Sequence, residues 1–148
     1  MEFPKAETFD VLIVGAGLSG IDAAYRLREK NPGLSYVILE NRERIGGTWD
    51  LFTYPGIRSD SDIFTLSFPW NPWRGNRLIA QGHEIRQYLE DSARDFGIAP
   101  HIRFRTEVVA ANFDTGTDLW TVDVRIDGEP ATYQARFLYS CTGYFRYD

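Results

Sequence analysis

The residues with the clearest chemical potential are three glycines, Gly15, Gly17 and Gly20, which follow an apolar run at residues 11–14. A short apolar run that ends at glycine predicts a strand buried on both faces. Residues 17–30 carry small and apolar side chains at helical spacing, which predicts a helix directly after the turn. In this strand–turn–helix context the G-x-G-x-x-G spacing indicates dinucleotide binding, because a helix N-terminus offers unpaired N–H groups to a pyrophosphate.

A carboxylate follows at the distance at which such a unit binds ribose. Residues 34–40 form a second candidate strand, and Glu40 at its end lies twenty positions after Gly20. An acidic residue there accepts hydrogen bonds from ribose hydroxyl groups. The alternative is a glycine-rich turn in an ordinary α/β protein with Glu40 as a solvated carboxylate, but the combined features favour a nucleotide site.

Length and composition exclude several other classes of protein. The 148 residues are enough for one domain with a real core, and the net charge of −5 predicts no basic face for nucleic acid. No apolar run reaches the length of a membrane span, and the N-terminus lacks the apolar region of a signal peptide. The single cysteine, Cys141, excludes an intrachain disulfide and fits a reducing cytoplasm. With only two histidines beside it, we expect no metal site.

Periodicity and turn signals predict the elements that position these residues. Residues 82–96 predict a helix that ends at Gly97. Period-two alternation predicts strands at residues 102–110, 119–126 and 131–137, with one more buried strand at 137–140. Residues 41–80 have little periodicity, and a loop of this length is usually functional. His83, at a helix start, and His101, at a strand entry, are expected to be structural.

Five motifs together resemble one protein family. They are VLIVGAGLSG at 11–20, Glu40, GGTW at 46–49, YPGIRSDSD at 54–62 and SCTGYF at 140–145. In this combination the chain resembles the N-terminal FAD-binding part of class B flavoprotein monooxygenases, which comprise the Baeyer–Villiger and the flavin-containing monooxygenases. The YPG-x-R-x-D stretch is closer to the Baeyer–Villiger branch. The resemblance implies one FAD-binding domain over residues 1–148, an α/β Rossmann-like fold of the glutathione-reductase type. Its parallel sheet carries a three-stranded antiparallel β-meander and is incomplete at the C-terminus.

The resemblance also implies roles for single positions. The pyrophosphate would be held by the first glycine turn, through Gly15, Ala16, Gly17, Leu18, Ser19 and Gly20. The adenosine ribose would be bound by Glu40, with Asn41 and Arg42 beside it, and the flavin-side phosphate and ribitol by Gly47, Thr48 and Trp49. The adenine would pair with the backbone of Val108, and Gly143 would let the exit loop of the last strand approach the cofactor. Asp60, the catalytic candidate, would face the isoalloxazine ring.

Aromatic and charged residues in the long segment have structural alternatives. Trp49 can equally be a core aromatic. The Pro55–Gly56 pair suits a type II turn that could aim residues 58–62 inward, although a solvated polar loop is the alternative for that stretch. Trp70 and Trp73 are expected to pack on a further domain.

The leading functional hypothesis is the FAD-binding portion of an NADPH- and O2-dependent monooxygenase acting on a ketone, aldehyde, amine or sulfide. The family pattern also includes an NADPH domain, the Baeyer–Villiger fingerprint and a final FAD segment, none of which occurs in these residues. We therefore expect an N-terminal fragment without a complete active site. Two alternatives remain open: the NAD(P)-binding domain of a dehydrogenase, and a non-catalytic nucleotide-binding module.

Overall fold

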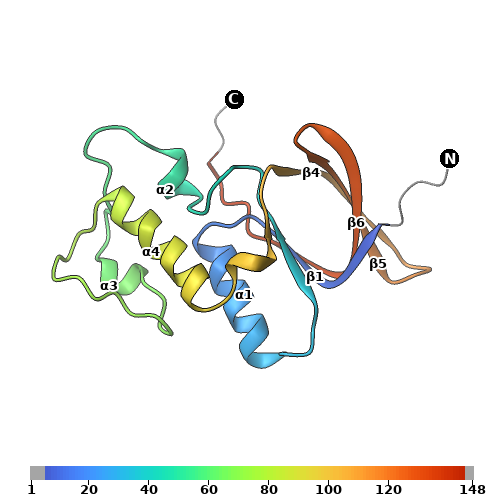
Figure 1. Cartoon of the computed structure of the whole chain (residues 1–148), viewed down its shortest axis with the longest axis horizontal. Coiled ribbons are helices and arrows are strands. Elements are labelled where there is room, and N and C mark those ends of the chain that lie inside the picture. Colours follow the sequence, from blue (N-terminus) through green and yellow to red (C-terminus); the bar gives the residue numbers. More distant parts are fainter. Residues whose placement is uncertain (1–5, 146–148) are drawn as a thin grey trace.

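The protein is built on one six-stranded sheet, and the structure, a computed structural model, describes residues 6–145 (Figure 1). The strand order is β3-β2-β1-β6-β5-β4. The strands are β1 (Glu7–Val14), β2 (Tyr36–Leu39), β3 (Ile102–Arg103), β4 (Thr106–Asp114), β5 (Leu119–Ile126) and β6 (Glu129–Ser140). β1 pairs in parallel with β2 and β6, and β2 with β3. β4, β5 and β6 form an antiparallel meander. The predicted fold class, a Rossmann-like α/β sheet with a meander, is confirmed.

The central strands are buried on both faces, as the apolar run predicted. Val11 and Ile13 pack into the core beneath the helices, whereas Leu12, between them, packs into a second core cluster with Val122 and Val124 of β5. Figure 1 shows how this arises, since helices α1 and α4 lie on one side of the parallel strands and the arch of the meander lies on the other. β1 begins at Glu7, four residues before the apolar run at residues 11–14.

β6 differs from its prediction, because the separate strand expected at 137–140 does not exist. One strand of twelve residues runs from Glu129 to Ser140. Its first half pairs with β5 and its second half with β1, so a single strand leaves the meander and enters the parallel sheet. It starts at a tight hairpin in which Asp127 and Gly128 both have positive φ, as a two-residue type I′ turn requires.

The strand predicted at 102–110 is also wrong as a single element. Arg105 has a φ of +52° and interrupts the extended chain, which leaves β3 as a short parallel strand and β4 as the first meander strand. The two strands therefore belong to opposite ends of the sheet. Within β4 a bulge between Val108 and Ala110 shifts the register. Period-two alternation does not reveal such a break, because the alternation continues through it.

The helices follow the sequence signals closely. α1 (Leu18–Lys30) and α4 (Gly82–Asp95) match their predictions within one residue. α4 starts with a capping box between Gln81 and Glu84, and Gly97 after it has the predicted left-handed conformation. Three short elements complete the fold: α2 (Thr48–Leu51), α3 (Ile63–Leu66) and the 3-10 turn η1 (Ala99–His101).

The expectation that Trp70 and Trp73 pack on a further domain is wrong. The Trp70 ring stacks between Tyr25 and Phe68, with centroids 4.0 and 4.4 Å away. Its Nε1 donates a hydrogen bond to Asp22 of α1. Trp73 packs against the core cluster beneath α4. These contacts attach the long 41–80 segment to α1 and α4, so its tryptophans are anchors within the domain.

Candidate functional site

The first glycine turn has the geometry that the sequence predicted. Gly17 is the N-cap of α1, directly after the turn that leaves β1. Gly15 has a φ of +104°, and a Cβ added there would lie 2.5 Å from the carbonyl oxygen of Cys141. A Cβ added to Gly20 would lie 1.9 Å from the carbonyl oxygen of Gly15. Only glycine fits these two positions, because the main chain of the turn packs directly against the helix and β6.

The N-terminus of α1 is open to an anion. Within the part of the chain that the structure describes, no side chain caps it, and its first turn holds no acidic residue. The N–H of Ile21 is bonded to the carbonyl of Gly17 at 3.1 Å, so the N–H groups of residues 18–20 have no partner within the helix by its geometry. Thirteen aligned peptide dipoles add partial positive charge at this end. A phosphate group fits both features.

Glu40 closes one side of the glycine turn. Its side chain is 5% exposed, and Oε2 accepts a hydrogen bond of 2.8 Å from the backbone N–H of Ala16. Oε1 accepts a hydrogen bond of 2.9 Å from the backbone N–H of Arg42. A carboxylate oxygen can accept more than one bond, so Glu40 keeps acceptor capacity for a ribose hydroxyl group. Asn41, next to it, is exposed.

The second glycine turn, residues 46–49, lies against the first. The N–H of Gly46 donates to the carbonyl of Ala16 at 3.2 Å. A Cβ added to Gly47 would lie 3.1 Å from Cα of Gly17, so the two backbones touch. Thr48 begins α2, and the half-buried Trp49 packs against both core clusters on the helix side. The structure thus brings Gly47, Thr48 and Trp49 beside the first turn.

Val108 and Gly143 come to the same end of the sheet from the meander side. The N–H of Thr106 donates to the carbonyl of Glu40 at 2.9 Å, which places the start of β4 beside Glu40. Val108 follows two residues later and is half-buried. Gly143 has a φ of +68° and lies exposed, just after Cys141, whose N–H donates to the carbonyl of Val14.

Asp60 and Asp62 differ in what they contact. Within residues 6–145, Asp60 is exposed and forms no hydrogen bond or ion pair. Asp62 caps α3 by accepting hydrogen bonds from the N–H and hydroxyl groups of Thr65. These bonds, the hydroxyl first, lower the pKa of the Asp62 carboxyl group. The type II turn at Pro55–Gly56 forms as predicted, with Gly56 at a φ of +83°. The Asp62 side chain after it, however, caps α3.

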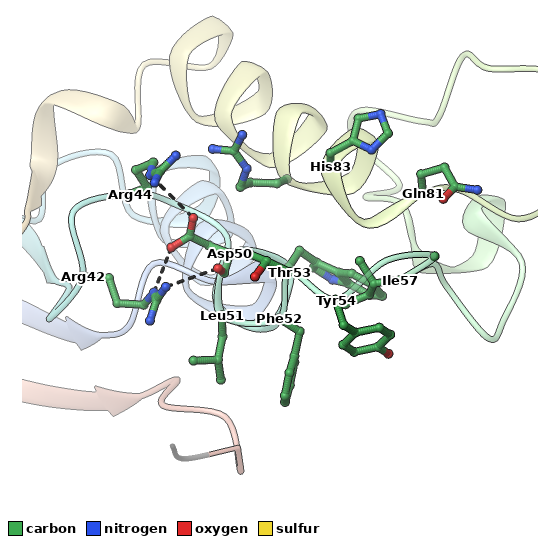
Figure 2. Close-up of a pocket in the computed structure, with 13 residues that line it drawn as sticks. Arg42, Arg44, Asp50, Leu51, Phe52, Thr53, Tyr54, Ile57, Gln81 and His83 are labelled. Carbon is green, nitrogen blue, oxygen red and sulfur yellow. Dashed lines mark hydrogen bonds and ion pairs between the residues drawn. The ribbon is translucent and has the colours of Figure 1, made fainter. Parts of the chain in front are cut away.

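A cavity of about 530 Å³ adjoins the second glycine turn (Figure 2). Its walls come from the segment at residues 42–57 and from the start of α4. Arg42 and Arg44 both approach the carboxylate of Asp50, with nitrogen–oxygen distances of 2.8 and 3.7 Å. His83 and Arg86 line the α4 side. Sequence reasoning missed Asp50, although opposite charges on both sides of a Gly–Gly turn were a usable signal.

Cys141 carries a half-buried thiol next to the first glycine turn. It packs against the helix-side core, and this burial raises the pKa of its thiol. Among the described residues, no group of three or more His, Cys, Asp or Glu side chains could hold a metal ion. In the same part of the chain, every helix is too short or too polar to cross a membrane.

Comparisons with known proteins agree with this geometry. A family described as an NAD(P)-binding Rossmann-like domain matches residues 13–76. The FAD-containing monooxygenase EthA of Mycobacterium tuberculosis is 49% identical over 142 residues, which are 96% of this chain and 29% of EthA. This chain therefore spans less than a third of that relative's length.

Two solved structures share the fold. An oxidized steroid monooxygenase bound to NADP superposes with a TM-score of 0.83 and 34% identity, over 92% of this chain and 26% of its own. A cyclohexanone-bound cyclohexanone monooxygenase superposes with a TM-score of 0.84 and 30% identity, over 96% of this chain and 28% of its own. The resemblance first drawn from the motifs is confirmed. By sequence and by fold, this chain is similar to a portion of proteins named FAD-containing, steroid and cyclohexanone monooxygenases.

Proposed function

We propose that this chain binds FAD and forms the nucleotide-binding portion of an NADPH- and O2-dependent monooxygenase. The observation that carries the proposal is the uncapped N-terminus of α1, reached by a glycine turn that has no room for side chains at Gly15 and Gly20. A buried carboxylate, Glu40, sits beside it. Together they match the two charged or polar parts of an adenosine diphosphate, its phosphates and its ribose diol.

Each part of the site has a distinct binding task. The N–H groups at the start of α1 donate to the pyrophosphate, and Glu40 accepts from the ribose. The main chain near Val108 pairs with the adenine edge. On the flavin side, Thr48 donates its hydroxyl group and Trp49 lends an aromatic wall. Gly143 leaves room for close approach at the end of β6.

The redox chemistry belongs to the cofactor. Held by residues 15–20, Glu40 and residues 47–49, FAD would supply hydride acceptance from reduced nicotinamide and electron transfer to O2. The residues of this chain orient the ring and exclude water from one side of it. Asp60 would face the ring and orient a cation or a ring N–H there.

We infer that the whole protein is of the Baeyer–Villiger type and converts a ketone to an ester. One structural neighbour, a cyclohexanone monooxygenase, has cyclohexanone bound, and this supports a ketone over an amine or a sulfide. In our proposal residues 1–148 do not complete that reaction, because the relatives are more than three times as long. Product formation by residues 1–148 that depends on NADPH and O2 would overturn this part.

A second candidate function is the NAD(P)-binding domain of a dehydrogenase. The matching family is described as NAD(P)-binding, which favours it. The β4–β6 meander argues against it, because a dinucleotide unit for NAD ordinarily continues with further βαβ units.

A titration separates these candidates. The purified chain is mixed with FAD, NAD, NADP or ADP, and bound nucleotide is measured by the change in flavin or protein fluorescence. We expect saturable FAD binding that NAD and NADP do not displace. Tighter binding of NAD than of FAD would favour the dehydrogenase candidate. Equal affinity for ADP and FAD, which would mean that the flavin half adds nothing to binding, would favour a nucleotide-binding module.

The variant Gly17→Asp tests whether the glycine turn is the site. Aspartate is a good N-cap, so it supports the helix while its charge repels a pyrophosphate. We expect FAD binding to fall at least about 100-fold, since charge-assisted contacts are replaced by repulsion. Gly33→Asp is the matched control, because Gly33 has open space around it. Equal FAD affinity in both variants would contradict the proposed site.

A further inference from the structure

The two glycine turns are joined by a closed circuit of hydrogen bonds. Its first half runs through Glu40, whose carboxylate accepts from the N–H of Ala16 at 2.8 Å and from the N–H of Arg42 at 2.9 Å. One buried carboxylate therefore fixes the first turn relative to Arg42, three residues after the end of β2. The backbone N–H of Arg42 makes this contact, so its side chain is free for another.

The second half of the circuit runs through the Arg42 side chain and Asp50. Nε of Arg42 donates to Oδ2 of Asp50 at 2.8 Å, and Nη2 donates to the carbonyl oxygen of Asp50 at 3.2 Å. The N–H of Asp50 donates to the carbonyl of Gly47 at 3.1 Å, and the N–H of Gly46 returns to the carbonyl of Ala16. Figure 2 shows the Arg42 side chain beside Asp50, with dashed lines joining the two residues.

Burial makes this ion pair more than a surface contact. The Asp50 side chain is 9% exposed and that of Arg42 is 37% exposed. A buried carboxylate is costly unless it is paired. Because the Arg42 guanidinium donates to both the carboxylate and the backbone carbonyl of Asp50, it fixes the distance and the orientation of that residue. Arg44 adds a longer contact of 3.7 Å and is 62% exposed, so its contribution is small.

The ion pair stabilises a backbone conformation at Gly46 and Gly47 that residues other than glycine rarely adopt. Gly46 and Gly47 have φ values of +145° and +54°, and Gly47 lies in direct backbone contact with Gly17. A shift of Asp50 would move α2, and with it Thr48 and Trp49, away from the first turn. The pair thus acts on the part of the site expected at the flavin side.

We propose that the Arg42–Asp50 ion pair is a positioning device that holds residues 46–49 against the first glycine turn and so sets the affinity for the flavin half of FAD. This inference rests on the proposed FAD-binding function. It assigns the Arg42 side chain to Asp50 and gives Asp50 a role in the site without contact to the nucleotide.

The test compares FAD with ADP, which lacks the flavin half. Dissociation constants for both are measured for the wild-type chain, Asp50→Asn, Arg42→Met and the double variant, together with urea unfolding. We expect each single variant to weaken FAD binding about 10-fold and ADP binding less than about 3-fold. The double variant should equal either single one, because each already breaks the pair.

Two further variants guard the interpretation. Arg42→Lys keeps the charge but loses the two-point grip, so it should retain more FAD affinity than Arg42→Met. Asp91→Asn makes the same side-chain change in an ion pair of 2.6 Å on α4, and it should leave both affinities unchanged.

Three outcomes would overturn the positioning role. They are unchanged FAD affinity in Asp50→Asn and Arg42→Met, equal losses for FAD and ADP that follow the loss of stability, and multiplied losses in the double variant. Wild-type chain that binds neither nucleotide would instead contradict the proposed function, and this inference with it.

Discussion

The two halves of the candidate site are built differently. The closed half, residues 15–20 with Glu40 and residues 46–47, is shaped by main chain in direct contact, and its one carboxylate is 5% exposed. The open half, residues 52–60 and 142–145, is lined by aromatic side chains that face outward. Tyr54 is 60% exposed and Tyr144 is 87% exposed. Phe52 and Phe145 meet edge to face at 5.1 Å across this half.

The difference shows that contacts within the domain fix the shape of the closed half and leave the open half less constrained. The backbone of the closed half is restricted to one arrangement, because an added Cβ would overlap neighbouring backbone atoms. In the open half Ser59 is buried and bonded to Ala80, but exposed side chains such as Asp60 can adjust to what binds. Variants in each half test this contrast, and their expected effects on stability decrease from Gly20 to Asp60.

Gly20→Ala should have the largest effect on stability. Its methyl group would have to occupy the place of the Gly15 carbonyl oxygen, so the helix must move away from the turn. We expect a loss of at least about 3 kcal/mol in the free energy of unfolding, measured with urea. Gly33→Ala, in open space, should change it by less than about 1 kcal/mol. Similar stability of the two variants would contradict the closed geometry.

Glu40→Gln should affect both stability and FAD binding. The amide keeps the shape but loses the charge, and it has only one acceptor oxygen for the N–H groups of Ala16 and Arg42. We expect a loss of about 1–3 kcal/mol in unfolding free energy and FAD binding weaker by at least about 10-fold. Urea unfolding and a flavin titration measure the two effects. Unchanged FAD affinity would argue against a ribose role for this carboxylate.

Asp60→Asn is the counterpart in the open half. Since Asp60 is exposed and unpartnered within residues 6–145, we expect the free energy of unfolding to stay within about 0.5 kcal/mol of wild type. The same urea experiment measures it. A loss as large as that of Glu40→Gln would mean that the open half is also held by fixed contacts.

Cys141 lies at the boundary of the two halves, and its reactivity tests where that boundary runs. Burial raises the pKa of its thiol, so less thiolate is present at neutral pH, and the alkylation rate should rise only as the pH passes above the range of a free cysteine. At neutral pH we expect the folded chain to react about 10-fold more slowly than the chain in urea. Equal rates, measured by mass spectrometry, would place Cys141 in the open half.

The same contrast explains how far the sequence could predict the structure. Gly15, Gly17, Gly20 and Glu40 were predictable because their roles depend on local backbone geometry and on a fixed spacing within one strand–helix–strand unit. Gly97 and the turn at 127–128 were predictable for the same reason. These signals lie within a few residues of the feature that they determine.

Long-range contacts account for what the sequence did not reveal. Trp70 contacts Tyr25 and Asp22 of α1, which lie about fifty residues away in the chain. The break at Arg105 depends on where β3 and β4 pair, and the continuity of β6 depends on β1. The Arg42–Asp50 pair is different, since its residues are eight positions apart and it forms because the Gly–Gly turn between them folds back. None of these contacts leaves a periodic trace.

The most direct test of the account is a two-dimensional NMR titration of the labelled chain with FAD. The central claim is that the diphosphate binds at the start of α1, so the largest shifts in backbone N–H signals should occur at residues 17–20, with smaller shifts at Glu40 and residues 46–49. The matched variant Gly17→Asp should lose them. Saturable FAD binding that leaves the signals of residues 17–20 unchanged would contradict the account.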